Sequence, residues 1–167
     1  MKRTKLLALA LAGVMVLALL TGCSDSSSKA KQVEECFRSR MQQKGDYQKD
    51  ETLDKKLEGI AQQFQPDWLA GEDLLTDEAQ NIIEEELKDY VITGSVWLWY
   101  GEVKPEQSAL AQAESMKQCA MVGFGRYDPS SGTALNAIAF TMTGKKSDGH
   151  RYYLALETYA TVNTPRT

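Results

Sequence analysis

The side chains best suited to chemistry are few, because 167 residues contain three cysteines and one histidine. Cys36 and Cys119 are 83 positions apart, which is neither a metal-ligand spacing nor a C-x-x-C redox motif. In an exported protein these two thiols could form a disulfide, which would stabilise the fold by about 4 kcal/mol. The alternative is a pair of buried thiols. His150 follows Asp148 in a glycine-containing turn, a pattern that favours a solvated histidine over a catalytic base.

Glu157 is the most informative carboxylate, because it lies inside a predicted strand among aromatic residues. A charge on an apolar strand face lies either at a sheet edge or in a pocket. A pocket here would bind a small apolar or aromatic ligand, and its lining would be Trp97, Trp99, Tyr153 and Glu157; ordinary core packing is the alternative for the tryptophans. The acidic run 84–86 is typical of a solvated helix face. We therefore expect no catalytic residues, no metal and no cofactor.

The first 22 residues differ in character from the rest of the chain. Lys2, Arg3 and Lys5 precede an almost unbroken apolar run over residues 6–20. This run is shorter than the roughly 20 residues of a membrane-spanning helix and has the length and flanks of a secretory signal. We expect residues 1–22 to be a signal peptide, 23–30 a polar tether and 31–167 a single domain.

The segment Leu20-Thr21-Gly22-Cys23 resembles the lipobox of bacterial lipoproteins. The resemblance implies cleavage between Gly22 and Cys23, and attachment of a diacylglyceryl group to the sulfur of Cys23. An anchor with two or more acyl chains holds a protein at a membrane far better than one chain does. The implied location is the extracytoplasmic side of the cell membrane or the outer membrane.

Net charge narrows the range of partners. Three of the 19 basic residues and none of the 23 acidic residues lie in the signal segment, so the remainder has 16 basic against 23 acidic side chains. That balance argues against DNA or RNA as a partner. It also argues against adhesion of the whole domain to anionic lipid head groups.

Hydrophobic periodicity predicts helices first and strands second along the mature chain. The predicted helices cover residues 31–44, 51–65 and 77–90, with Asp50 and Thr76 as N-caps and Pro66 after the second helix. The predicted strands cover residues 91–100, 118–127, 133–143 and 151–162. Residues 105–117 could be a short helix or a loop. Short turns at 128–132 and 144–149 predict that the last three strands are antiparallel neighbours.

These elements make an α+β domain with about three N-terminal helices packed on a curved antiparallel sheet of about four strands. The predicted strands are apolar on both faces. Helices can cover one face, and the second face would need sheet curvature, another subunit or a ligand. The element order resembles the cone-shaped fold of the nuclear-transport-factor-like (SnoaL-like, cystatin-like) superfamily, in which N-terminal helices fill the concave side of the sheet. No functional residue is transferred from that resemblance.

Two functions fit these features. The first is a lipid-anchored cell-envelope protein that acts as a non-catalytic interaction or scaffold module, with an envelope protein or a second copy as its partner. The alternative is a binding protein for a small apolar or aromatic ligand in a cone-shaped pocket.

Overall fold

The computed structural model describes residues 26–71, 74–90, 93–120, 124–125 and 136–160. Four α-helices lie in these segments: α2 Ser26–Gln42, α3 Glu51–Gln63, α4 Asp77–Leu87 and α5 Ala109–Ser115. The strands are β1 Leu69–Gly71, β2 Leu74–Leu75, β3 Thr93–Glu102, β4 Lys117–Ala120, β5 Phe124–Gly125, β6 Ala137–Met142 and β7 Tyr152–Ala160. A 3-10 turn, Pro66–Trp68, follows α3. The α+β class and the packing of helices on an antiparallel sheet are confirmed.

Side-chain caps fix the starts of three helices. The Asp50 carboxylate accepts hydrogen bonds from the backbone N–H groups of Thr52 and Leu53 at the start of α3. Thr76 caps α4 in the same way, and both caps were predicted. Ser108 caps α5, which resolves the ambiguity of residues 105–117 in favour of a short helix.

Helix α2 already includes Ser26, the first residue that the structure describes, five residues before the predicted start. The prediction of a tether over residues 23–30 is therefore wrong for residues 26–30. Nothing in this stretch breaks a helix, and the extra turn gains tertiary contacts, which usually outweigh weak local propensity. Ala30 packs against the core, and the Lys29 ammonium donates a hydrogen bond to the carbonyl oxygen of Pro105.

The sheet has the strand order β1-β2-β4-β3-β7-β6, and its antiparallel centre is β4-β3-β7-β6. The β6–β7 pair is a hairpin, as predicted, and Gly149 in its turn has a φ of 83°, which favours glycine. The predicted pairing of the strand over 118–127 with the following strand is wrong, because β4 and β5 both pair with β3. Strand β2 extends the sheet as a parallel neighbour of β4.

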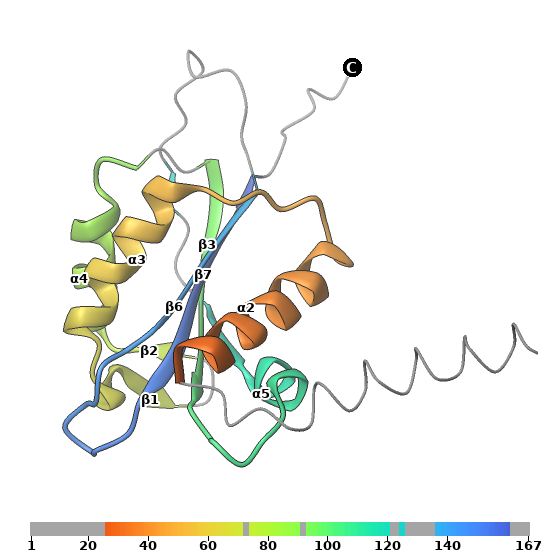
Figure 1. Ribbon diagram of the computed structural model, residues 1–167. Helices are drawn as coiled ribbons and strands as arrows, with labels where there is room; N and C mark the ends of the chain where they lie inside the picture. The colour runs from red at the N-terminus through yellow and green to blue at the C-terminus, as the bar shows by residue number, and fades with distance from the viewer. Residues whose placement is uncertain (1–25, 72–73, 91–92, 121–123, 126–135, 161–167) are drawn as a thin grey trace, which may run out of the picture.

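Both faces of the sheet are covered by the chain's own helices (Figure 1). On one face α3 and α4 pack against alternate residues of the central strands, including Val96, Leu98 and Leu156. On the other face α2 and α5 pack against the intervening residues, including Trp99, Ile138 and Tyr153. The second apolar face predicted from the strand sequences exists, but within the described residues it needs neither a subunit nor a ligand to cover it.

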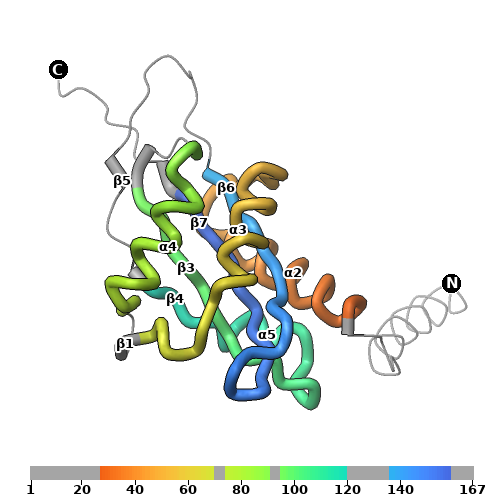
Figure 2. The backbone as a smooth tube through the Cα atoms, turned by 90° about the vertical axis from the view of Figure 1, so that its left-hand side faces the viewer, coloured from red at the N-terminus to blue at the C-terminus, as the bar shows by residue number. Residues whose placement is uncertain are grey.

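The connection over residues 43–50 joins the two helix layers across the β6 edge of the sheet (Figure 2). Gln48 forms a parallel bridge with Ala137. The Gln48 N–H donates to the carbonyl oxygen of Asn136 over 2.8 Å, and the Gln48 carbonyl accepts from the Ile138 N–H over 3.2 Å. This pairing satisfies part of the exposed edge, which would otherwise invite association with another strand.

Candidate functional site

The four residues of the predicted pocket share one face of the sheet, as their alternation along the strands predicts. Trp97 lies directly opposite Glu157 in the β3–β7 register, and Tyr153 lies further along β7 on the same face. This is the face that α2 and α5 cover. Trp99, Tyr153 and Glu157 are buried, whereas Trp97 is half-buried.

Glu157 is a buried carboxylate, 6% exposed, whose two oxygens both have protein donors. The Tyr47 hydroxyl donates to Oε1 over 2.5 Å, and the Trp99 indole N–H donates to Oε2 over 2.8 Å. A buried carboxylate is tolerated when such bonds replace its hydration. The Glu157 carboxylate, which the sequence predicted would face a ligand, therefore links Tyr47 of the 43–50 connection to Trp99 at the centre of the sheet.

Helix α2 and the turn that follows it place two cations and an aromatic ring near Trp99. The Arg40 guanidinium is 5.5 Å and the Lys44 ammonium 5.3 Å from the centroid of the indole. Phe37 meets the same indole edge-on, with 5.5 Å between ring centroids. Cations within about 6 Å of an aromatic ring are attracted by its negative face. The Trp99 indole therefore donates its N–H to a carboxylate and has two cations near its ring, and both interactions are electrostatically favourable.

Arg40 also links α2 to α5. Its guanidinium donates to the carbonyl oxygens of Ala113 at 3.1 Å and Glu114 at 3.4 Å, at the C-terminal end of α5, where cations are favoured. In the sequence, Arg40 interrupts the apolar stripe that Val33, Phe37 and Met41 form on this helix. The structure accounts for the interruption, because the Arg40 side chain spans the interface between the two helices instead of entering the core.

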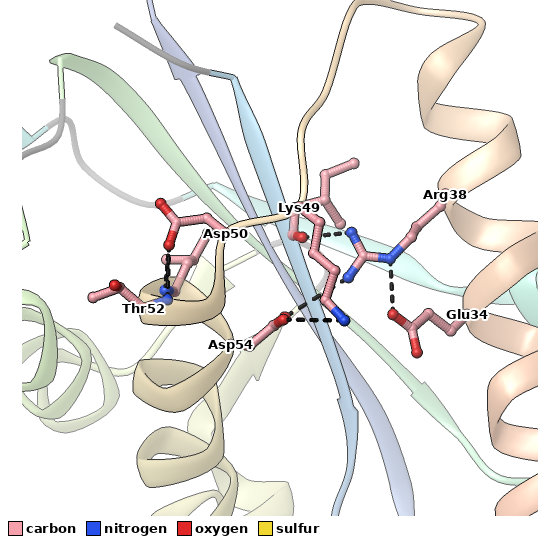
Figure 3. A network of polar contacts seen from close by, with 8 residues as sticks. Glu34, Arg38, Lys49, Asp50, Thr52 and Asp54 are labelled. Atoms are coloured by element: carbon pink, nitrogen blue, oxygen red, sulfur yellow. Dashed lines mark hydrogen bonds and ion pairs between the residues drawn. The ribbon is translucent and has the colours of Figure 1, made fainter. Parts of the chain in front are cut away.

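A second polar cluster lies at the β6 edge, where α2 and α3 approach each other (Figure 3). The Arg38 guanidinium donates to the carbonyl oxygen of Ile138 over 2.6 Å and to Glu34 over 2.8 Å. Arg38 is also 3.7 Å from a carboxylate oxygen of Asp54, and Lys49 is 3.8 Å from the other. The Arg38 guanidinium thus satisfies the Ile138 carbonyl at the open edge of the sheet and helps to protect that edge.

Asp50, the N-cap residue of α3, and Asp54, in the first turn of that helix, have opposite pKa shifts. Burial raises the pKa of Asp54, and the nearby Arg38 and Lys49 only partly counter it. Burial also acts on Asp50, but hydrogen bonds from the Tyr90 hydroxyl and the first N–H groups of the helix lower the pKa of that carboxyl overall. Both shifts follow from structural contacts and indicate no acid–base pair.

The remaining candidates for catalysis are exposed. His150 Nδ1 lies 2.8 Å from the Glu102 carboxylate, and the Asp148 carboxylate accepts from the His150 backbone N–H and, over 2.6 Å, from the Tyr152 hydroxyl. These contacts fold the β6–β7 turn. Across the described residues, no three His, Cys, Asp or Glu side chains gather closely enough to hold a metal ion.

The structure does not bring the two cysteines together. Cys119 is fully buried on the α3 and α4 face, opposite Leu98. Cys36 is half-buried on α2, on the other face, and no disulfide joins the two. The possible Cys36–Cys119 bridge is therefore corrected, because the sheet lies between them. The lipidation candidate Cys23 lies outside the described residues.

Tyr47, Arg38 and Lys44 have structural roles that sequence reasoning missed. Tyr47 lies in a mixed polar connection without periodicity, so no pattern indicated that it is buried.

None of the helices in the described part of the chain is long and apolar enough to span a membrane. No protein-family model, curated protein or solved structure matches this chain.

Proposed function

We propose that this protein is a lipid-anchored cell-envelope protein whose folded domain is a non-catalytic interaction or scaffold module. The observation that supports it most strongly is the lipobox-like segment Leu20-Thr21-Gly22-Cys23 directly after an apolar run with basic residues before it. A lipidated Cys23 would hold the domain on the extracytoplasmic side of the cell membrane or the outer membrane.

The environment of the strand carboxylate supports a non-catalytic role. A general acid or base must reach a substrate proton. Both oxygens of Glu157 are instead bonded to Tyr47 and Trp99 beneath helix α2. The same bonds give Glu157 protein partners at both oxygens, which is why we favour the interaction module over the small-ligand alternative.

The experiment is expression of the full chain in a bacterial host, followed by membrane fractionation and mass spectrometry of the N-terminal peptide. The expected result is a membrane-bound protein whose first residue is Cys23 with a diacylglyceryl mass. Cys23→Ser is the matched control, and it should yield no lipidated peptide. Recovery of wild-type chain without a lipid on Cys23 would refute the proposal.

A further inference from the structure

The short distance along the chain between helix α2 and Cys23 limits how this domain can sit on a membrane, provided that the proposed function is correct. Ser26, which is already part of α2, is three peptide units from Cys23. Three units span at most about 11 Å along the chain. A lipid on Cys23 would therefore hold the first turn of α2 at the head-group level, and the neighbouring surface would face the bilayer.

Contacts in the structure define that neighbouring surface. Lys29 in the first turns of α2 donates to the carbonyl oxygen of Pro105, so the loop before α5 lies beside the start of α2. The Val103 N–H donates to the carbonyl oxygen of Arg151 over 2.8 Å, which adds the β6–β7 turn. We name this surface the anchor end, and it consists of residues 26–32, 102–110 and 143–151. Figure 2 shows it as the end of the molecule where α2 begins.

The anchor end is positively charged, unlike the rest of the chain. It has six lysines and arginines against three acidic residues, whereas the rest of the chain after Cys23 has ten against twenty. Lys31, Lys104 and Lys145 are exposed. Two of the three acids, Glu102 and Asp148, already contact His150. The negative total charge therefore does not describe this surface, and lysines near a bilayer are attracted to anionic head groups.

An exposed apolar side chain lies at the same end. Leu110 is 56% exposed in the first turn of α5, directly after the loop that Lys29 contacts. Leu74 is similarly exposed at 61%, but it belongs to β2, which pairs with β1. Strand β1 lies on the opposite side of the molecule from the start of α2 (Figure 2). Exposed leucine beside lysines is the composition of surfaces that lie in the membrane interface.

We propose that the anchor end docks on the bilayer surface, with Lys31, Lys104 and Lys145 toward anionic head groups and Leu110 in the interface. The lipid supplies attachment, and this surface fixes the orientation of the domain. Helix α4, with its acidic side chains, then lies away from the bilayer and is available to envelope partners. The C-terminal end of α3 adjoins the anchor end, because the Lys146 ammonium donates to the carbonyl oxygens of Ala61 and Gln62.

The test is amide hydrogen exchange on the full lipidated chain reconstituted on vesicles of phosphatidylglycerol and phosphatidylcholine. The reference is the Cys23→Ser chain with the same vesicles. We expect several-fold slower exchange in peptides covering residues 103–108 of the lipidated protein, and no change in peptides of α4. The double variant Lys104→Gln with Leu110→Ser should lose this protection, whereas the matched variant Leu74→Ser should retain it.

The outcomes separate this inference from the proposed function. A chain that has lipid on Cys23 but exchanges at residues 103–108 as the reference does would overturn the docking and leave the lipid anchor intact. Equal loss of protection in Leu74→Ser would also overturn it. Absence of lipid on Cys23 would overturn both proposals.

Discussion

The two faces of the sheet are both buried, but they are built differently. The face under α3 and α4 is an apolar layer in which helix and strand periodicities interlock. The face under α2 and α5 has aromatic residues together with a buried carboxylate and two cations near one tryptophan. The first face is held by apolar burial, and its side-chain hydrogen bonds, such as Tyr90 to Asp50 and Gln63 to Glu86, link α3 to the region of α4 instead of entering the sheet. The second also depends on hydrogen bonds that specify where α2 and the 43–50 connection must lie.

Loss of a phenylalanine on each face tests whether both are true core. Phe37, in α2, and Phe64, the C-cap residue of α3, are both fully buried on opposite faces. We expect Phe37→Ala and Phe64→Ala each to lower the free energy of unfolding by about 3–5 kcal/mol, because each leaves a cavity. Urea unfolding of the two variants measures this. A loss at Phe37 below half of that at Phe64 would contradict equal packing of the faces.

Replacement of the buried carboxylate tests what distinguishes the second face. Glu157→Gln preserves the shape but offers a single acceptor oxygen to the donors Tyr47 and Trp99. We expect a loss of about 1–3 kcal/mol, the cost of one buried donor left without a bond. The control is the double variant with Tyr47→Phe, which removes one donor and should lose less than the sum of the two single variants. Strict additivity would show that Tyr47 and Glu157 do not interact in solution.

The aspartates at the α2–α3 junction should respond to pH with opposite signs. The pKa of Asp54 is raised on folding, so its stabilisation is present below the unfolded pKa and is lost as pH rises through the folded pKa. The pKa of Asp50 is lowered, so its stabilisation is present above the unfolded pKa and is lost as pH falls through the folded pKa.

We therefore expect Asp50→Asn to cost more stability at neutral pH than in acid. Asp54→Asn should cost more in acid than at neutral pH. Urea midpoints at acid and neutral pH measure both effects, and each variant is the control for the other. Shifts of the same sign in both variants would show that these contacts do not control the titrations.

The last prediction concerns the reactivity of the two thiols and involves no substitution, so it has the smallest expected effect on stability. Cys36 is half-buried on α2, and Cys119 is fully buried under α3 and α4. We expect native protein to react with a maleimide at Cys36 only, and unfolded protein to react at both. Intact mass should equal that of the reduced chain. A mass two hydrogens lower would restore the disulfide hypothesis.

Most helices and strands can be predicted from the sequence, because local capping and hydrophobic alternation determine where they lie. Asp50, Thr76 and Pro66 mark helix ends by their own chemistry, and alternation correctly places Trp97, Trp99 and Glu157 on one strand face. The start of α2 was missed because Ser26 to Lys29 have weak local signals, and contacts with the 103–108 loop extend the helix. The turn sequence at 128–132 led to the wrong prediction that β4 pairs with the next strand along the chain. Strand β4 pairs with β3 instead, because strand pairing depends on the arrangement of the whole sheet.

The sequence by itself determined the α+β class, the first three helices and the long strands after them, the two apolar faces of the strands and the signal-like N-terminus. It did not predict the short strands β1 and β2 between α3 and α4. Only the tertiary structure decided which helix covers which face, since each amphipathic helix fits either apolar surface equally well. It also decided that Glu157 bonds to Tyr47 and Trp99, because these residues are distant in sequence. Hydrophobic periodicity shows which side of a helix or strand is apolar. Which helix packs on which face of the sheet depends on where the connecting segments, such as 43–50, pass around the edge of the sheet.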